Sequence, residues 1–209
     1  MQKIGNKLIY LITKGETNAE NFAEKQGEIL EIIKRAVEAE ISLIQIREKQ
    51  LSAKLLYELA KNAAQITKDS NTKLLINDRA DVAFAADADG VHLTEKSLSA
   101  ETIRANFPKD FIIGVSVHTL GKALEVKANG ADFVTFSPIF HSPNKGEPVG
   151  LEKLREVCEK LEDFPVIALG GIDETNYMEV LEIADGFAAI RFLNNFINAK
   201  ARRCKDAKL

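Results

Sequence analysis

The chain has 209 residues and a formal net charge of −3, with 45% hydrophobic and 28% charged residues. This length is enough for one domain with a substantial core and lies near the lower limit for an eight-stranded α/β barrel. The composition is globular, and the weak negative charge argues against nucleic acid or an anionic membrane as a partner. The longest apolar runs are too short to span a bilayer. Two cysteines without metal-type spacing favour a reducing, cytoplasmic location.

Short apolar runs alternate with amphipathic stretches along the chain, and no linker rich in proline, glycine or serine divides it. Several of these runs are nearly continuous in Val, Ile, Leu and Phe, as expected for parallel strands buried on both faces. The predicted strands are residues 8–13, 42–46, 73–76, 89–93, 111–115, 132–137, 165–169 and 186–190.

Between the predicted strands, apolar residues recur at the spacing of a helix that buries one face. Ser52, Thr119 and Asp173 each stand where a helix is expected to begin, and their side chains suit the N-cap position. The predicted helices are residues 22–39, 52–68, 119–129, 150–161 and 173–183.

Alternating strands and helices allow two architectures, a closed (β/α)₈ barrel and an open doubly wound sheet. The unit repeats about every 26 residues, and no glycine-rich turn of the dinucleotide-binding kind follows the first strand. Both points favour the barrel. The sequence therefore predicts the α/β class, with a single TIM-barrel domain over residues 1–209.

Unusual polar residues cluster where the predicted strands end. In a barrel of this kind the active face is built from the loops that follow the strands. All three histidines, His92, His118 and His141, are expected on this face. The other polar segments expected there are 45–49, 77–79, 116–119, 141–148 and the pair Gly170–Gly171.

The segment after the second strand has the composition of a phosphate clamp. Gln45, Arg47 and Lys49 alternate along an extended segment, so we expect their side chains on one side. Two cations and an amide in this arrangement suit a monophosphate or a diphosphate. The alternative is a structural ion pair at the end of the strand.

Three further residues are candidates for binding or proton transfer. Asp78, beside Asn77, is expected to hold a Mg²⁺ ion that bridges the same phosphates, or else to serve as a helix-start carboxylate. Gly171 allows close backbone approach to a phosphate, or else forms a tight turn. His118 can transfer protons near neutral pH, or else is a hydrogen-bonded structural group.

Seven segments, in order, resemble the thiamine phosphate synthase / TenI superfamily, from about Leu8 to about Leu193. The resemblance implies a compact (β/α)₈ barrel. The synthase branch of that family joins hydroxymethylpyrimidine diphosphate to thiazole phosphate and releases pyrophosphate, whereas the TenI branch isomerises thiazole carboxylate phosphate or has unassigned roles. The segments are QIREK (45–49), INDR (76–79), GVHL (90–93), GVSVHT (114–119), PIF (138–140), PVGLEKL (148–154) and ALGGI (168–172).

The resemblance implies phosphorylated pyrimidine and thiazole small molecules as partners, and Mg²⁺ as cofactor with Asp78 as its ligand. The family's pattern makes Lys49, Ser116 and His118 the catalytic candidates. The substrate-binding candidates are Gln45, Arg47, Lys49, Asn77, Ser142, Asn144, Lys145, Gly171 and Arg191.

The chain departs from the synthase pattern at three places. Ser97 occupies the position of the second Mg²⁺ ligand, normally an aspartate, and cannot supply a carboxylate. Ser142 and Asn144 stand where the synthase loop carries two threonines. Arg191 stands where the end of the eighth strand normally offers small residues to a phosphate.

Three functions therefore stay open. Thiamine phosphate synthase leads, because the residues of the pyrimidine-diphosphate clamp are intact. A TenI-type thiazole tautomerase is second, with His118 as its acid/base. A non-catalytic barrel that binds a phosphorylated ligand is third. The sequence also allows a homo-oligomer formed through helix faces.

Overall fold

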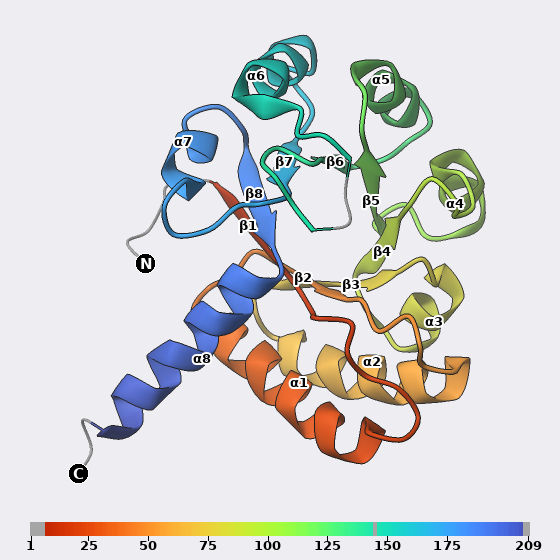
Figure 1. The fold of residues 1–209 in the computed structure, drawn as a ribbon. Helices are drawn as coiled ribbons and strands as arrows, with labels where there is room; N and C mark the ends of the chain where they lie inside the picture. The colour runs from red at the N-terminus through yellow and green to blue at the C-terminus, as the bar shows by residue number, and fades with distance from the viewer. Residues whose placement is uncertain (1–6, 144–145, 207–209) are drawn as a thin grey trace. The chain divides into compact units, whose positions relative to one another are not determined.

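The computed structural model describes residues 7–143 and 146–206. In these ranges eight strands alternate with eight helices (Figure 1). The strands are β1 Leu8–Ile12, β2 Leu43–Ile46, β3 Lys73–Asn77, β4 Gly90–Leu93, β5 Ile112–Val117, β6 Phe133–Phe136, β7 Val166–Leu169 and β8 Gly186–Ala189. The helices are α1 Phe22–Glu38, α2 Ala53–Thr67, α3 Ala80–Ala85, α4 Ala100–Asn106, α5 Leu120–Ala128, α6 Gly150–Lys160, α7 Tyr177–Leu181 and α8 Arg191–Asp206.

Neighbouring strands pair in parallel, as the registers of β2 with β3, β5 with β6, β6 with β7 and β7 with β8 show. Within the described residues the strand order runs from β1 to β8 and closes into a barrel. A helix connects each strand to the next, which is the crossover connection that parallel neighbours need. The barrel predicted from the repeat is confirmed.

The chain falls into two compact units, which we describe separately. The first unit comprises the chain up to Tyr10 together with Val91–Ala189, and the second comprises Leu11–Gly90 together with the chain from Ile190 onward. The expectations of a single domain over 1–209 and of a homo-oligomer stay predictions.

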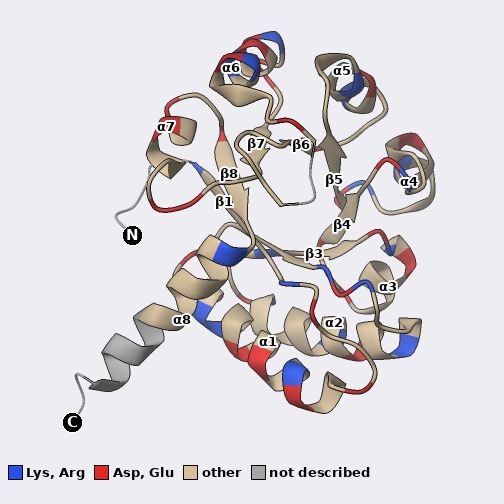
Figure 2. Ribbon diagram, viewed as in Figure 1, with Lys and Arg blue, Asp and Glu red and all other residues tan. Residues whose placement is uncertain are grey.

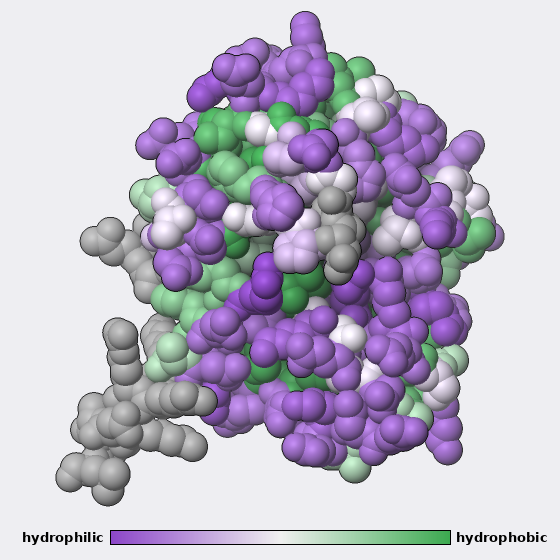
Figure 3. Space-filling model, in the orientation of Figure 1, coloured by the Kyte–Doolittle hydropathy of each residue, from purple (hydrophilic) through white to green (hydrophobic). Residues whose placement is uncertain are grey.

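In the second unit, α1 shows why the helical periodicity predicted its position. Its buried residues recur at helical spacing, and α1 packs against α2 and α8. Basic and acidic positions are interleaved along the rest of α1 (Figure 2), and hydrophilic side chains dominate the surface over α1 and α2 (Figure 3). The buried residues of α1 are Phe22, Ile29, Ile33 and Ala36.

The predicted helix starts are confirmed at two positions and wrong at a third. Ser52 accepts a hydrogen bond from Leu55 N at 3.4 Å, and Thr119 accepts one from Lys122 N at 3.2 Å. Each of these bonds satisfies a backbone donor in the first turn of a helix.

The predicted helix over 173–183 is wrong in its extent, because α7 covers only Tyr177–Leu181. The Asp173 carboxylate accepts hydrogen bonds from both Thr175 N, at 2.9 Å, and Thr175 Oγ1, at 2.6 Å. An Asp side chain that bonds two residues ahead forms a turn that competes with helix formation. The helix therefore begins after this turn.

Gly186, in β8, leaves no room for a side chain. A Cβ at this position would overlap the carbonyl oxygen of Leu8 in β1. Gly27, in α1, has no heavy atom within 4 Å of an added Cβ. The two glycines are therefore a matched pair for testing how closely β8 approaches β1.

We expect Gly186→Ala to lower the free energy of unfolding by about 1–3 kcal/mol, the usual cost of overpacking. Gly27→Ala should raise it by about 0.5–1 kcal/mol, because glycine is disfavoured inside a helix. Urea denaturation of the two variants and the wild type measures both changes. Equal effects of the two substitutions would contradict this packing of β8.

Candidate functional site

In the second unit, one buried carboxylate fixes the loop that follows β1. Glu48 is 3% exposed and accepts hydrogen bonds from Gly15 N at 3.1 Å and Thr17 N at 2.9 Å. The Thr13 hydroxyl accepts another from Arg47 N at 2.8 Å. Bonds of backbone donors to a charged acceptor are stronger than neutral ones, so they hold the loop against the segment after β2. The sequence analysis missed this role of Glu48.

The residues of the predicted clamp differ in exposure. Gln45 is 1% exposed within β2, whereas Lys49 is exposed beyond its end. The strand ends at Ile46, and the bond from Leu51 N to Glu48 O at 3.2 Å forms a turn. The paired strand therefore ends before Lys49. The expectation that Gln45, Arg47 and Lys49 share one side stays a prediction, as do the roles of these residues.

In the second unit, Arg47 lies against the loop after β1 and follows a residue that pairs with β3. A Cβ at Gly15, whose φ is +77°, would lie 3.4 Å from Nη1 of Arg47, so the guanidinium lies against the loop after β1. Ile46 of β2 pairs with Ile76 of β3. The next residues after this pair are Arg47, just beyond β2, and Asn77, the last residue of β3.

Asp78 follows Asn77 with a φ of 63°, a conformation that few residues other than glycine adopt. It does not cap α3, whose N-cap position is held by Arg79 without a side-chain cap bond. Arg79 instead binds Asp81, with Nη2 to Oδ2 at 2.6 Å, and this bond lowers the pKa of Asp81. Asp78 is exposed, and among the described residues its carboxylate has no hydrogen bond or ion pair. Strained backbone of this kind clusters at functional sites.

Arg191 is the first residue of α8, and its side chain is exposed. The start of this helix is fixed by Asn194, which is 1% exposed. Its Nδ2 donates hydrogen bonds to Ile12 O at 2.8 Å and Ile190 O at 2.7 Å. These bonds tie α8 to the end of β1, so Arg191 projects from an anchored helix.

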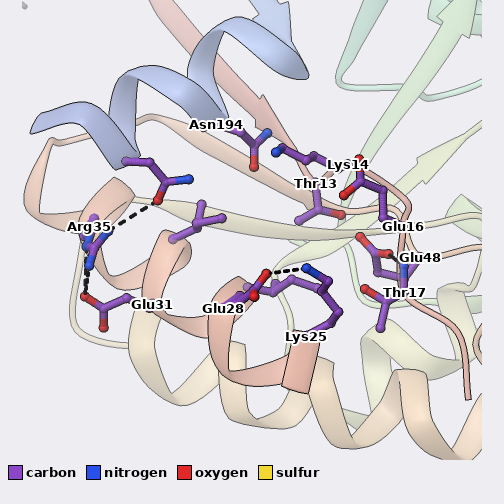
Figure 4. Close-up of a pocket in the computed structure, with 13 residues that line it drawn as sticks. Thr13, Lys14, Glu16, Thr17, Lys25, Glu28, Glu31, Arg35, Glu48 and Asn194 are labelled. Carbon is purple, nitrogen blue, oxygen red and sulfur yellow. Dashed lines mark hydrogen bonds and ion pairs between the residues drawn. The ribbon is translucent and has the colours of Figure 1, made fainter. Parts of the chain in front are cut away.

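A cavity of about 430 Å³ lies in the second unit beside α1, α8 and the loop after β1 (Figure 4). Its charged side chains are largely paired with one another, as in Lys25 with Glu28 at 2.7 Å and Arg35 with Glu31 at 2.8 Å. Neither Gln45 nor Arg47 lines it. This cavity is therefore separate from the predicted clamp, and its lining indicates no ligand.

In the first unit, Ser116 lies in β5 and is half-buried. Its hydroxyl contacts Nε2 of His92 at 2.9 Å and the hydroxyl of Thr135 at 3.1 Å. The expectation that His92 belongs to the open face is wrong, because this residue lies within β4 and is 3% exposed. His118 and His141 are exposed.

His118, directly after β5, has a defined tautomer. Its Nδ1 lies 2.6 Å from the carbonyl oxygen of Ser137. A carbonyl oxygen only accepts hydrogen bonds, so Nδ1 carries the proton in the neutral ring. The lone pair is then on Nε2, and the exposed ring can act there as a base.

Gly171 is required by close packing. Its φ is +65°, and an added Cβ would lie 2.6 Å from His141 O and 2.7 Å from Cβ of Phe140. Asn176 Nδ2 donates a hydrogen bond to Gly171 O at 3.0 Å. The turn after β7 is therefore packed against the segment after β6, and the tight-turn explanation accounts for this glycine. Its contact with a phosphate stays a prediction.

The other residues that depart from the synthase pattern occupy different settings. The Ser97 hydroxyl accepts a hydrogen bond from Thr94 N at 2.8 Å and thus closes a turn. Ser142 is half-buried after β6. Asn144 and Lys145 lie outside the described residues. Among the described side chains of residues 7–143 and 146–199, His, Cys, Asp and Glu nowhere form a group of three that could hold a metal ion.

Cys158, in α6, is a free thiol. Burial is the main cause that raises its pKa, to about 11. The thiolate is the nucleophilic form of cysteine, so the raised pKa makes Cys158 a weak nucleophile near neutral pH. In the same described ranges, no helix combines the length and the apolar composition needed to cross a membrane.

The chain was compared with known proteins. A family model described as thiamine monophosphate synthase matches residues 9–193. The putative thiamine-phosphate synthase of Geobacter sulfurreducens is 40% identical over 173 residues, which cover 81% of this chain and 80% of that protein. The thiamine-phosphate synthase of Clostridium tetani is 36% identical over 169 residues, which cover 79% and 80%. The structure of thiamine phosphate pyrophosphorylase from Pyrococcus furiosus matches with a TM-score of 0.78 and 31% identity, covering 93% of each chain.

Replacement of the Glu48 carboxylate should release the loop after β1. Glu48→Gln keeps one acceptor but loses the charge, so we expect the free energy of unfolding to fall by about 1–3 kcal/mol. The amide hydrogens of Gly15 and Thr17 should exchange faster with solvent. Hydrogen exchange read by NMR measures this change.

The matched control for this variant is Glu31→Gln, which removes an exposed ion pair on α1. An exposed pair contributes about 0–1 kcal/mol, so the control should leave the exchange at Gly15 and Thr17 unchanged. Unaltered exchange in Glu48→Gln as well would show that the carboxylate does not anchor the loop.

The raised pKa of Cys158 predicts slow alkylation. In a Cys204→Ser background, the remaining thiol should react with iodoacetamide at least about tenfold more slowly than a free cysteine peptide at about pH 8. Mass spectrometry over time measures the rate. Reaction as fast as that of the peptide would contradict the burial of this thiol.

Proposed function

The chain belongs to the thiamine monophosphate synthase family, and we propose that it is a transferase that couples hydroxymethylpyrimidine diphosphate to thiazole phosphate, giving thiamine phosphate and pyrophosphate. The resemblance seen in the sequence is confirmed at the level of the family. The observation that supports the proposal is the register that pairs Ile46 of β2 with Ile76 of β3. The residues that follow this pair in the second unit are Arg47 on one strand, and Asn77 and Asp78 on the other.

The second unit offers the charges that a diphosphate needs. Arg47 presents a planar guanidinium that can bind two phosphate oxygens at once. Lys49 adds a second cation beyond the end of β2, and the buried amide of Gln45 adds a neutral polar group. The loop held by Glu48 lies against Arg47 and limits the positions that the guanidinium can take. We propose that these residues hold the diphosphate.

The residues present suit one Mg²⁺ ion held partly by the substrate. Mg²⁺ in phosphate-handling sites uses one or two carboxylates, with phosphate oxygens and water as its other ligands. Asp78 is exposed and, within the described residues, has no competing ion pair. Ser97 already closes a turn with its hydroxyl and offers no carboxylate. When bound, the metal would neutralise the diphosphate and make pyrophosphate a better leaving group.

The proposed coupling exchanges one bond for another. The C–O bond between the pyrimidine methylene and the diphosphate breaks, and pyrophosphate departs with the electron pair. The nitrogen of thiazole phosphate then donates its lone pair to the methylene carbon and forms the C–N bond. Neither step requires a protein nucleophile. The protein therefore acts through charge and position, with Arg47 and Lys49 stabilising the departing pyrophosphate.

Four further residues are candidates for contact with the phosphorylated ligands. Ser116 offers a half-buried hydroxyl from β5, and Gly171 presents backbone after β7. We propose these two because their positions match the family's pattern. Ser142, after β6, and Arg191, the cation at the start of α8, depart from that pattern, and we propose them for their hydroxyl and guanidinium groups.

A thiazole tautomerase is the second candidate, and the geometry of His118 favours it. Moving a ring double bond requires removal of a proton from one carbon and its return to another. The Nδ1 bond to Ser137 O leaves the Nε2 lone pair exposed for this exchange. The synthase reaction does not need such a base.

We further propose that the protein functions in the cytoplasm. Cys158 is a free thiol, and proteins of reducing compartments keep their cysteines in that form.

The direct test supplies both substrates with Mg²⁺ and measures thiamine phosphate and pyrophosphate, which should form in equal amounts. Asp78→Asn should lower kcat/KM by about hundredfold or more, because it removes the charge proposed to hold the metal. The matched control, Asp81→Asn, breaks an exposed pair with Arg79 and should change kcat/KM by less than about twofold.

Each alternative outcome has a distinct meaning. Isomerisation of thiazole carboxylate phosphate without coupling would assign the tautomerase, and its loss in His118→Ala would identify the base. Tight binding of a phosphorylated thiazole without either reaction would assign a binding protein. Coupling that keeps its rate and its Mg²⁺ dependence in Asp78→Asn would refute the role of Asp78.

A further inference from the structure

A continuous hydrogen-bond chain crosses the interior of the first unit. The Tyr10 hydroxyl of β1 lies 3.1 Å from Nδ1 of His92 in β4, and Nε2 of the same ring lies 2.9 Å from the Ser116 hydroxyl of β5. The hydroxyl of Thr135, in β6, lies 3.1 Å from that of Ser116 and 3.5 Å from Nε2. This series of hydrogen bonds thus begins in the core, at Tyr10, and ends at Ser116.

Burial distinguishes the members of this chain. Tyr10 and Thr135 are 0% exposed and His92 is 3% exposed, whereas Ser116 is half-buried. Barrel interiors are usually filled by branched aliphatic residues, and each buried polar group that loses its partner costs about 1–3 kcal/mol. A requirement for volume alone would be met more simply by apolar side chains. Volume alone therefore does not explain these buried polar groups. Their function is to be sought at Ser116, the member of the hydrogen-bond chain that is only half-buried.

Packing among aromatic rings fixes the orientation of the residues in this hydrogen-bond chain. Phe133 of β6 meets the ring of Tyr10 at 5.7 Å with an edge-on angle of 80°, and the ring of His92 at 6.0 Å. The rings of Tyr10 and His92 are themselves 5.6 Å apart. Tightly packed rings of this kind keep few rotamers, so the imidazole has a fixed orientation toward Ser116.

The chemistry of these four side chains indicates which of them donates and which accepts in each hydrogen bond. A phenol is a better donor than acceptor, which favours donation from the Tyr10 hydroxyl to Nδ1 of His92 and a ring proton on Nε2. Nε2 then donates to the Ser116 oxygen, whose second lone pair can accept the hydroxyl proton of Thr135. With its lone pairs engaged from the core, Ser116 has its own proton left for an acceptor outside the core.

We propose that Tyr10 and His92 are positioning residues that hold the Ser116 hydroxyl as a hydrogen-bond donor to a lone-pair atom of the bound substrate, a ring nitrogen or a phosphate oxygen. The role in turnover rests on the proposed synthase function. Unconstrained, a serine hydroxyl rotates and donates or accepts. The buried chain removes the accepting orientation, so the substrate meets a preorganised donor.

A double-mutant cycle tests the coupling. Tyr10→Phe removes one oxygen and keeps the ring contacts with His92 and Phe133. We expect it to lower kcat/KM by about three- to tenfold, the effect of losing one hydrogen bond. In a Ser116→Ala background the same change should have no further effect. Additive losses would show that the Tyr10 hydroxyl acts independently of Ser116 and would overturn the proposal.

Two sets of variants distinguish a role in orienting the Ser116 hydroxyl from a general loss of activity or stability. Tyr57→Phe, on an exposed face of α2, is the matched control and should leave kcat/KM unchanged. His92→Gln keeps an amide donor near the position of Nε2, whereas His92→Leu does not. His92→Gln should retain more activity than His92→Leu at equal thermal stability. Equal activities would count against a donor role for the imidazole.

The tautomer has a direct spectroscopic signature that does not depend on turnover. The chain has three histidines, so the ring nitrogens of His92 can be assigned by ¹⁵N NMR with single substitutions of the other two. We expect the Nε2–H tautomer in the wild type and a shift toward Nδ1–H in Tyr10→Phe. The Nδ1–H tautomer in the wild type would overturn the proposed direction of the chain.

Failure of the synthase assignment is distinguishable from failure of this inference. A wild-type chain that does not couple the two substrates refutes the proposed function before any variant is compared. The inference is then tested by calorimetric binding of hydroxymethylpyrimidine diphosphate and of thiazole phosphate. An affinity loss in Tyr10→Phe that vanishes in the Ser116→Ala background supports it, and an unchanged affinity for both ligands overturns it.

Discussion

Parallel strands impose one constraint on the whole chain, because each connection must return to the edge where the previous strand began. Here a helix makes each return, and every strand therefore delivers its last residues to a loop of the same kind. Strand interiors are filled mostly by apolar residues, with the hydrogen-bonded His92, Ser116 and Thr135 among the exceptions, so most polar side chains lie at the strand ends. Arg47 after β2, Asp78 after β3 and His118 after β5 all follow from this arrangement.

The periodic part of this architecture was accessible from the sequence. Runs of Val, Ile and Leu predicted the strands, and Ser52 and Thr119 predicted two helix starts, because these signals act over a few residues. The helix start predicted at Asp173 was wrong because its signal also extends over only a few residues. Its carboxylate serves equally well as a cap or in a turn, and the choice depends on neighbours that a local pattern does not include.

Features that depend on distant partners were not accessible. The bonds from Glu48 to the loop after β1 join residues more than thirty positions apart, and Asn194 binds a carbonyl group at the opposite end of the chain. The burial of Glu48, an acidic residue between two cations, is not encoded in any local pattern. His92 resembled a site residue for the converse reason, since composition does not distinguish a buried imidazole from an exposed one. The candidate site residues were predicted from sequence motifs that occur in the same order as in the family.

The two units differ in the kind of candidate group that they offer. In the second unit, Arg47, Lys49 and Asp78 are partly or fully exposed, and charges of this kind act over distance on a charged ligand. In the first unit, the half-buried Ser116 hydroxyl contacts His92, and the exposed ring of His118 is oriented by the carbonyl group of Ser137.

The packing of Gly171 couples two turns of the first unit. The turn after β7 contacts Phe140 and His141 so closely that no side chain fits at this position. A larger residue at position 171 would have to displace the segment after β6 as well as its own turn. The positions of these two turns are therefore set together, and a change of sequence in one constrains the other.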